Sequence, residues 1–305
     1  MKDWDFAKGI RNFTTVESNS YVATNINRPM HVILSLILPL LLSFSACSPS
    51  TEAVVNTDTQ RVKITYIANE GVLISSGDKQ VLIDGLHREY KPAYAFPPKD
   101  LLTALETAQP PYDEIDLVLV SHLHLDHFHP ESVGLHLKNN PRAQLVSSDQ
   151  IADGVKKDYG GYAGIEKQVR RITPEWKTKA RFSSGGINVQ VLGLRHGGAH
   201  FSWIQNLGYL IEINGKKFLH IGDADMTAEN FSSFRLNEEG IDIAFIPYWY
   251  LMSESGRSFV REQFKPKQVI AVHVPAAEAE SLAEKFSKDY PGTITFKTIL
   301  ESKSF

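Results

Sequence analysis

Cysteine is almost missing from this chain, whose 305 residues include one, Cys47. A single cysteine cannot form an internal disulfide, which excludes a small fold held together by disulfide bonds. An excess of basic charge is also missing: 32 Lys and Arg stand against 35 Asp and Glu, a formal net charge of −3, with no basic stripe. Because a basic stripe is the usual footprint of nucleic-acid binding, we expect no nucleic-acid partner. Repeats of the solenoid type are absent from the sequence.

Long apolar runs are scarce as well, and the one that stands out, residues 32–44, is short. It includes Pro39 and falls below the ~20 residues that a membrane-spanning helix needs. Its length, and the small residues that follow it, are typical of the apolar region of a signal peptide. The stretch Phe44-Ser45-Ala46-Cys47 resembles a bacterial lipobox, although Phe44 stands where leucine is usual. The resemblance implies acylation of Cys47; the alternative is an ordinary cleaved signal with an incidental cysteine.

These features divide the chain into three expected segments. Residues 1–46 would be a signal peptide with an extended N-terminal region, whose start codon the sequence leaves open. Residues 47–60, rich in Ser, Thr and small residues, would form a flexible tether. Residues 61–305 would form one globular domain, large enough to bury a core without disulfides. The lipobox resemblance implies an exported lipoprotein, anchored to a membrane through Cys47 on the periplasmic face or surface of a bacterium.

The most informative stretch of the sequence is a histidine cluster at residues 122–129 (HLHLDHFH). The run before it, residues 115–120, is apolar and β-branched, so it predicts a buried strand. Pro130 prevents that strand from continuing, which places the cluster at the C-terminal end of a central strand. Crowded imidazoles and a carboxylate indicate a shared divalent metal, and nitrogen and oxygen ligands without thiolate suit zinc, iron or manganese. The alternative is a solvated, histidine-rich loop.

The pattern H-x-H-x-D-H of residues 122–127 closely resembles the signature of the metallo-β-lactamase superfamily. That resemblance implies an α/β fold, an αββα sandwich with two metals at one edge, and hydrolysis of esters, lactones, amides or phosphodiesters. Three later matches follow in the family's order, each after a strand-like run, and they are His196, Asp223 and His273. Residues 62–67, 71–75 and 80–84 look like the opening β-meander of the family. The resemblance covers roughly residues 61 to 300 and predicts a single catalytic domain.

The resemblance also implies a role for each matched residue. The first metal would be held by His122, His124 and His196. The second metal would be held by Asp126, His127 and His273, with Asp223 bridging the two ions. The ions would be zinc, with manganese or iron as alternatives, and they would share the hydroxide that attacks the substrate. Asp126 would in addition orient that hydroxide.

Other polar residues have weaker assignments. His200 follows His196 in a Gly-rich loop, so we expect it to face the pocket as a proton donor or substrate contact; the alternative is an exposed loop histidine. Asp84, at the end of the meander, would orient a ligand by hydrogen bonding, or would be an ordinary turn aspartate. The other histidines carry less signal: we expect His129 to be structural, His220 to lie in the core or behind the ligands, and His87 and His136 to be merely polar.

The predicted function is metal-dependent hydrolysis of an ester, lactone or phosphodiester bond. Residues 69–74 (NEGVLI) and 272–275 (VHVP) resemble the branch of ascorbate-phosphate lactonase and acyl-ethanolamine phospholipase D. Residues 201–203 and 247–252, rich in aromatic side chains, would line a cleft for a small-molecule or lipid-like substrate, or would pack in the core. The alternatives are a non-catalytic metal-binding surface lipoprotein and a di-iron redox enzyme of the same fold. The sequence indicates no oligomeric state.

Overall fold

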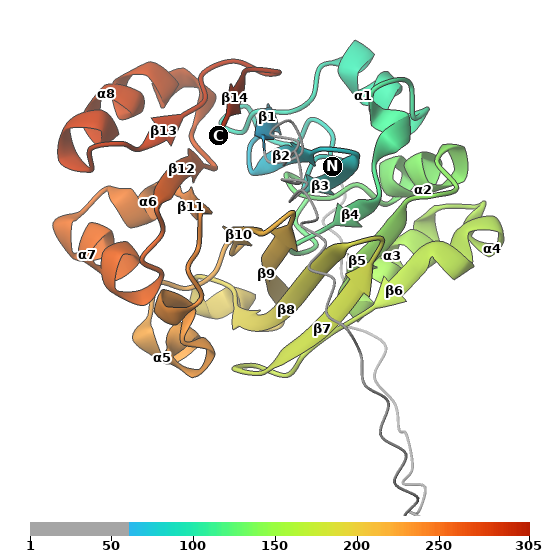
Figure 1. The fold of residues 1–305 in the computed structure, drawn as a ribbon. Helices are drawn as coiled ribbons and strands as arrows, with labels where there is room; N and C mark the ends of the chain where they lie inside the picture. The colour runs from blue at the N-terminus through green and yellow to red at the C-terminus, as the bar shows by residue number, and fades with distance from the viewer. Residues whose placement is uncertain (1–60) are drawn as a thin grey trace, which may run out of the picture. The chain divides into compact units, whose positions relative to one another are not determined.

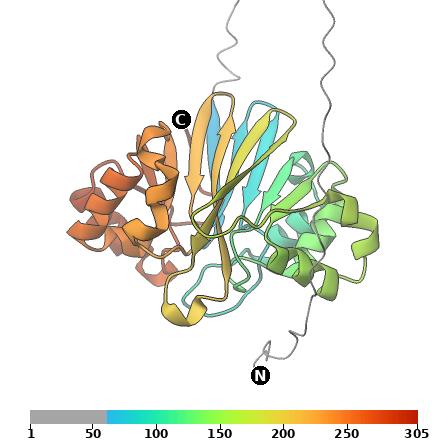
Figure 2. The same cartoon turned by 90° about the horizontal axis from the view of Figure 1, so that it is seen from below.

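The computed structural model describes residues 61–305, in which two β-sheets pack face to face between two layers of helices (Figures 1 and 2). The helices of the N-terminal half cover one sheet and those of the C-terminal half cover the other (Figure 2). This is the αββα arrangement that the sequence predicts. The expected signal peptide, residues 1–46, and tether, residues 47–60, lie outside the described residues. No helix within residues 61–305 is both long and apolar enough to cross a membrane.

The first sheet has the strand order β14-β1-β2-β3-β4-β5-β6. Its strands are β1 Val62–Ala68, β2 Gly71–Ser76, β3 Lys79–Ile83, β4 Leu117–Leu119, β5 Gln144–Ser147, β6 Val169–Arg171 and β14 Ser302–Ser304. The antiparallel pairing of β1, β2 and β3 is the predicted meander, and Gly77 takes the left-handed backbone (φ 58°) that its turn requires. From β3 to β6 the strands are parallel, as expected of buried strands joined by helical crossovers.

The second sheet has the strand order β13-β12-β11-β10-β9-β8-β7. Its strands are β7 Lys179–Ser184, β8 Ile187–Arg195, β9 Gln205–Ile213, β10 Lys216–His220, β11 Ile243–Pro247, β12 Gln268–Val272 and β13 Ile294–Thr295. It also combines both kinds of pairing: antiparallel from β7 to β10 and parallel from β10 to β13. The two sheets are therefore built alike, with a meander on one side and crossover strands on the other.

Helices cover the outer faces of both sheets (Figure 1). Against the first sheet lie α1 Lys99–Glu106, α2 Pro130–Asn139, α3 Asp149–Asp158 and α4 Tyr162–Ile165, and against the second α5 Ala228–Phe231, α6 Tyr248–Leu251, α7 Glu254–Gln263 and α8 Ala279–Asp289. Their starts follow local rules. Pro130 occupies the first position of α2, where its missing N–H costs nothing. Ser148 and Ser253 cap α3 and α7 by accepting hydrogen bonds from backbone N–H groups of the first turn.

Three apolar layers hold these elements together. The central layer lies between the sheets and includes Phe218 and Phe245, both fully buried. The other two lie between each sheet and its helices. Because both faces of each sheet are covered, some central strands are apolar along their whole length: β4 reads LVL, and all five residues of β11 are buried. This is why the strand that precedes the histidine cluster appears in the sequence as an apolar run.

One buried hydroxyl joins the two sheets beneath the histidine cluster. Tyr209 of β9 is fully buried, and its Oη donates to the carbonyl oxygen of Val120 at 2.7 Å. The same Oη lies 3.2 Å from the carbonyl oxygen of Val146 in β5. Val120 lies two residues before the cluster, so this hydrogen bond helps to fix where the cluster begins relative to the second sheet.

Replacing Tyr209 by phenylalanine should therefore destabilise the domain. The change leaves buried carbonyl oxygens with one donor fewer, a loss of about 1–2 kcal/mol in the free energy of unfolding. Urea denaturation of residues 61–305 measures it. Tyr112→Phe is the matched control, because the hydroxyl of Tyr112 forms no hydrogen bond with another described residue. Equal stability losses in the two variants would contradict a structural role for the Tyr209 hydroxyl.

Candidate metal centre

The seven predicted ligands all lie just beyond the C-terminal end of a strand. The loop after β4 carries His122, His124, Asp126 and His127. His196 directly follows β8, Asp223 follows β10, and His273 directly follows β12. The strand ends meet at one edge of the sandwich, so residues up to 151 positions apart in the sequence become neighbours.

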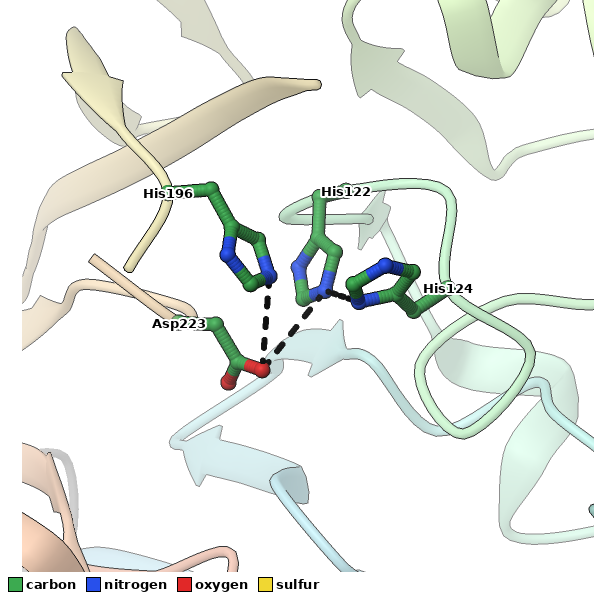
Figure 3. A group of neighbouring side chains, drawn as sticks. All are labelled: His122, His124, His196 and Asp223. Carbon is green, nitrogen blue, oxygen red and sulfur yellow. Dashed lines mark hydrogen bonds and ion pairs between the residues drawn. The ribbon is translucent and has the colours of Figure 1, made fainter. Parts of the chain in front are cut away.

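The first group of side chains consists of His122, His124, His196 and Asp223 (Figure 3). His122 Nε2 lies 3.0 Å from His124 Nδ1 and 3.8 Å from Asp223 Oδ2. His196 Nε2 lies 3.5 Å from the same Oδ2. The backbone holds His196 beside Asp223, because His196 pairs with Ala224 and the N–H of Gly197 donates to the Asp223 carbonyl at 2.7 Å. Three imidazoles and a carboxylate thus converge on one point.

The second group consists of Asp126, His127 and His273. Asp126 Oδ2 lies 3.2 Å from His273 Nε2 and 3.5 Å from His127 Nε2. The two groups meet at Asp223. Its Oδ1 lies 3.6 Å from His127 Nε2, and its Oδ2 lies 3.7 Å from His273 Nε2. Asp223 therefore stands between the groups, in the position that a bridging ligand requires.

Asp84 and Ser121 orient two of the imidazoles from behind. Asp84 accepts hydrogen bonds from the Ser121 N–H at 2.7 Å and from Ser121 Oγ at 2.5 Å. His127 Nδ1 lies 2.9 Å from Asp84 Oδ2, so Nδ1 carries the proton and Nε2 faces the centre. Ser121 Oγ lies 3.0 Å from His122 Nδ1. Asp84 thus does what the sequence suggested, and Ser121 adds a link that the sequence did not indicate.

Asn69 performs the same task for Asp126. Its Nδ2 donates to Asp126 Oδ2 at 3.1 Å, and its carbonyl oxygen accepts from the His273 N–H at 3.1 Å. Asn69, Asp84 and His273 all have left-handed backbone, with φ of 51°, 44° and 55°. Such conformations cost free energy in non-glycine residues and persist where the surroundings hold them in place. Three such residues at one edge of the sandwich indicate that the surrounding contacts hold the backbone of the site in this strained conformation.

Burial and mutual charge set the protonation of the centre. Burial lowers the pKa of His122 well below its usual value, and burial together with His196 and His127 lowers the pKa of His124 to about 4. Burial opposes ionisation of Asp126, but His127 and His273 bring its pKa to about 2. At pH 7 both imidazoles are therefore neutral and the carboxylate is charged, which are the forms that bind metals.

The same side chains leave lone pairs without partners. His127 Nε2, His196 Nε2 and Asp223 Oδ1 are buried and have no hydrogen-bond partner among the described residues. Leaving such atoms unpaired is costly, and divalent cations would pair them. Two ligands about 2.0–2.1 Å from a tetrahedral zinc lie roughly 3.4 Å apart, close to the separations observed in both groups. The donors are nitrogen and oxygen only, so the residues fit two divalent cations.

Comparison with known proteins agrees with this geometry. A family model described as a β-lactamase superfamily domain matches residues 92–290. The chain belongs to this superfamily. The matched residues begin after the opening meander and include every predicted ligand of the candidate metal centre, from His122 to His273.

Two relatives of this chain are named metal-dependent hydrolases. A UPF0173 metal-dependent hydrolase from Thermus thermophilus is 26% identical over 223 residues, covering 70% of this chain and 83% of that protein. Another UPF0173 metal-dependent hydrolase, from Pelotomaculum thermopropionicum, is 27% identical over 224 residues, covering 70% of this chain and 84% of that protein. The chain is thus similar to both relatives over most of their length.

Solved structures share the fold. Igni18, a metallo hydrolase from Ignicoccus hospitalis, matches 81% of this chain and 99% of its own with a TM-score of 0.56 at 17% identity. YhfI, a metallo-β-lactamase fold protein from Bacillus subtilis, matches 81% of this chain and 100% of its own with a TM-score of 0.54 at 15% identity. The αββα sandwich predicted from the sequence is thereby confirmed.

A cavity of about 460 Å³ opens beside the candidate metal centre. Its lining residues are His196, Gly197, Gly198, Asp223, Ala224, Asp225, Met226 and Trp249. Aromatic rings also surround the ligands: the Trp249 and Tyr94 rings meet that of His273 at 5.1 and 5.0 Å between centroids, and Phe201 meets His124 at 4.8 Å. The two predicted aromatic segments therefore divide, since Phe201 and Trp249 reach the site, whereas Tyr250 and Leu251 are buried in the core.

His200 lies apart from both ligand groups. It is exposed in the 3₁₀ turn η4 Ala199–Phe201, with its ring centroid 3.8 Å from that of Phe201, and it does not line the cavity. A proton-donating role for His200 stays a prediction. His129 directly precedes α2, in keeping with the structural role expected of it.

Two histidines expected to be merely polar are fully buried. His136 Nδ1 lies 2.7 Å from the carbonyl oxygen of Leu105 and so links α2 to α1. His87 is buried with neither ring nitrogen in a hydrogen bond to a described residue. The sequence carried no signal for this burial, because a single histidine has no local pattern that reveals how the surrounding elements pack over it.

Glu70 was missed for the same reason. It lies in the turn between β1 and β2, is fully buried, and its Oε2 lies 3.5 Å from His220 Nε2 and 3.9 Å from His127 Nδ1. Burial and the charge of Asp223 raise the pKa of Glu70 well above its usual value. His220 is buried in contact with it, so the placement of His220 behind the ligands agrees with expectation.

His87 should make the metal-free domain sensitive to acid. Burial lowers its pKa to about 4 from the usual 6.5, so between these pH values the unfolded chain binds more protons than the folded one. The free energy of unfolding should therefore fall as pH drops from 6.5 to 4, with a share of about 3 kcal/mol from His87. Denaturation in EDTA, compared between wild type and His87→Leu, isolates that share. Parallel pH dependences in the two proteins would contradict a neutral, buried His87.

Proposed function

We propose that this chain is a metal-dependent hydrolase that uses two divalent cations to cleave an ester, lactone or phosphodiester bond. The observation that carries the proposal is the position of Asp223, whose carboxylate lies 3.5–3.8 Å from the imidazoles of His122, His127, His196 and His273. A carboxylate between two groups of imidazole and carboxylate donors is suited to bridge two cations. The relatives named metal-dependent hydrolases support the same reading.

The side chains of the centre divide the work. Divalent ions bound there would supply a water of lowered pKa and a positive charge that polarises the scissile bond. Asp84 keeps the proton of His127 on Nδ1, so that Nε2 remains a ligand. Asn69 fixes one oxygen of Asp126, which leaves that carboxylate oriented toward the centre. We assign Asp126 the further role of accepting a hydrogen bond from the attacking water.

We propose zinc as the metal, with manganese or iron as alternatives. Histidine nitrogens and carboxylate oxygens without thiolate bind all three, and zinc favours the four-ligand arrangement of the first group. Two alternatives can be told apart from a zinc hydrolase. A non-catalytic metal-binding lipoprotein would show no turnover, and a di-iron redox enzyme would contain iron.

Metal content and ligand substitutions test the proposal together. Protein purified after metal-supplemented expression should hold about two divalent ions per chain. His122→Ala and Asp223→Ala should lower turnover at least ~100-fold, because partners behind the ligands alone are worth 10–100-fold. Elemental analysis and a panel of lactone, phosphodiester, β-lactam and ester substrates provide the two measurements.

Asp153→Ala is the matched control, because Asp153 is exposed on α3 and pairs with Arg171 far from the ligands in sequence. It should keep both metal and activity, and circular dichroism should show all three variants folded. Less than about one ion per chain in the wild type would sink the two-metal centre. Two bound ions without turnover of any substrate would favour the binding protein instead, and two irons with redox activity would favour the redox enzyme.

We also propose that the enzyme is exported and anchored through a lipid on Cys47. The support is the apolar run that ends in small residues before Cys47 and the Ser/Thr-rich stretch after it, all outside the described residues. With this placement we propose a small-molecule or lipid-like substrate, as in the lactonase and phospholipase D branch that the sequence resembles. None of the seven predicted ligands lies upstream of Cys47, so the anchor and the catalytic centre are separable.

Labelling with a clickable fatty acid tests the anchor. Wild-type protein should take up the label, because Cys47 would carry the acyl chains. It should also stay on the membrane, because each buried CH₂ of an acyl chain contributes about 0.8 kcal/mol to attachment. Cys47→Ser should remain an unlabelled precursor, whereas a chain beginning at Ser48 should be soluble and active. Cleavage near residue 47 without label in the wild type would identify an ordinary secretory signal.

A further inference from the structure

The cavity beside the metal centre contains a carboxylate that the proposed chemistry does not use. Asp225 lines the cavity two residues after Asp223 and is half-buried. Its side chain forms no hydrogen bond or ion pair with another residue in the part of the chain that the structure describes; the bonds at this position are made by its backbone N–H and carbonyl. A free carboxylate in a partly enclosed wall is available to a ligand.

Apart from Asp225, the lining consists of the predicted ligands His196 and Asp223 and of apolar or small residues. Met226 and Trp249 provide the large side chains, Gly197, Gly198 and Ala224 leave space, and the lining contains no Lys or Arg. Trp249 also meets the ring of His273, so this wall reaches from the second ligand group to Asp225. A group that enters the cavity would therefore contact thioether, indole and carboxylate.

Two arginines close in sequence to the cavity-lining residues make contacts with other parts of the protein. The guanidinium of Arg195, which precedes His196, stacks 3.3 Å from the centroid of the Trp176 ring. Arg257 Nη1 donates to the carbonyl oxygen of Leu251 at 2.9 Å. Neither side chain is among the cavity-lining residues, so the charge of Asp225 is not neutralised from that side.

We infer that the cavity selects the substrate by charge: it takes a compact apolar group that carries a positively charged nitrogen, accepts a neutral one less well, and disfavours an anion. The inference rests on the proposed hydrolase and concerns the part of the substrate beside the bond that is cleaved. Sites built for anionic groups present Arg or Lys, whereas indole and carboxylate together are typical of ammonium recognition.

Three acetate esters of similar size test this selection. They are acetylcholine, the neutral isostere 3,3-dimethylbutyl acetate and the anionic 2-acetoxyethanesulfonate. We expect kcat/KM to fall in that order, by about tenfold at each step. The corresponding alcohols give a readout that needs no turnover, since choline should quench Trp249 fluorescence at lower concentration than 3,3-dimethylbutanol or isethionate. Trp249→Phe identifies the part of the signal that comes from this residue.

Asp225→Asn should reduce the preference for acetylcholine over its neutral isostere, measured as the ratio of the two kcat/KM values, about tenfold. Asp100→Asn, at an exposed position in the first turn of α1, is the matched control and should keep the wild-type preference. If Asp225→Asn does not fold, the order of the three alcohols on wild-type protein still decides the question.

The outcomes separate the two proposals. A preference for the sulfonate, or an unchanged acetylcholine preference in folded Asp225→Asn, would overturn charge selection while leaving a hydrolase in place. If metal-loaded protein cleaves none of the esters or the wider panel, the hydrolase fails, and the fluorescence order of the alcohols alone supports or overturns the cavity assignment.

Discussion

The carboxylate of Asp223 lies within 3.8 Å of four imidazole nitrogens that come from three separate loops. This contact sets a demand on the whole fold, because the ends of β4 in one sheet and of β8, β10 and β12 in the other must meet at one edge. A strand advances about 3.3 Å per residue and alternates its faces, so a register slip of one residue would move a ligand away from the centre. The double sheet is thus the support on which the ligand distances depend.

The polar core of the centre is tolerated because nearly every member has a partner behind it. The single carboxylate of Asp84 accepts hydrogen bonds from the N–H and Oγ of Ser121 and contacts Nδ1 of His127. Asn69 joins Asp126 to the backbone of His273, and so connects the turn between β1 and β2 with the end of β12. Among the predicted ligands, the buried atoms without a hydrogen-bond partner in the described residues are His127 Nε2, His196 Nε2 and Asp223 Oδ1. Unpaired atoms at the meeting point of an otherwise bonded network are the expected condition of a metal site.

The proposed substrate recognition and the proposed chemistry depend on one segment, from His220 to Met226. Asp223 stands between the ligand groups, and Asp225 and Met226 line the adjoining cavity. Gly222 makes this compact arrangement possible, because its φ is 54° and a Cβ there would lie 2.7 Å from Asn206 Oδ1. That amide oxygen accepts from the Asp223 N–H at 3.1 Å, so the turn that places Asp223 also places Asp225. A substitution in this segment that alters substrate preference would therefore also risk displacing Asp223, the predicted metal ligand.

Much of the fold and the ligand set could be predicted from the sequence because their signals are local. Each predicted ligand follows a strand-like run, and residues 115–120 are the clearest case: β4 is Leu117–Leu119, and the flanking Ile115 and Val120 are buried as well. The crowding of residues 122–127 carries its own chemical meaning, whatever the rest of the chain does. The loop histidine His200 had equally local support, yet it lies in an exposed turn outside both groups.

Only the tertiary structure decided the burial of Glu70, His87 and His136, the contact of Trp249 with His273, and the place of Asp225 in the cavity wall. In the sequence Glu70 follows an asparagine in a tight turn and Asp225 resembles any surface aspartate. Their surroundings come from elements distant along the chain, and packing between two sheets is set by the sum of many apolar contacts rather than by the pattern around one residue. The environment of a single polar side chain is therefore a property of the assembled sandwich.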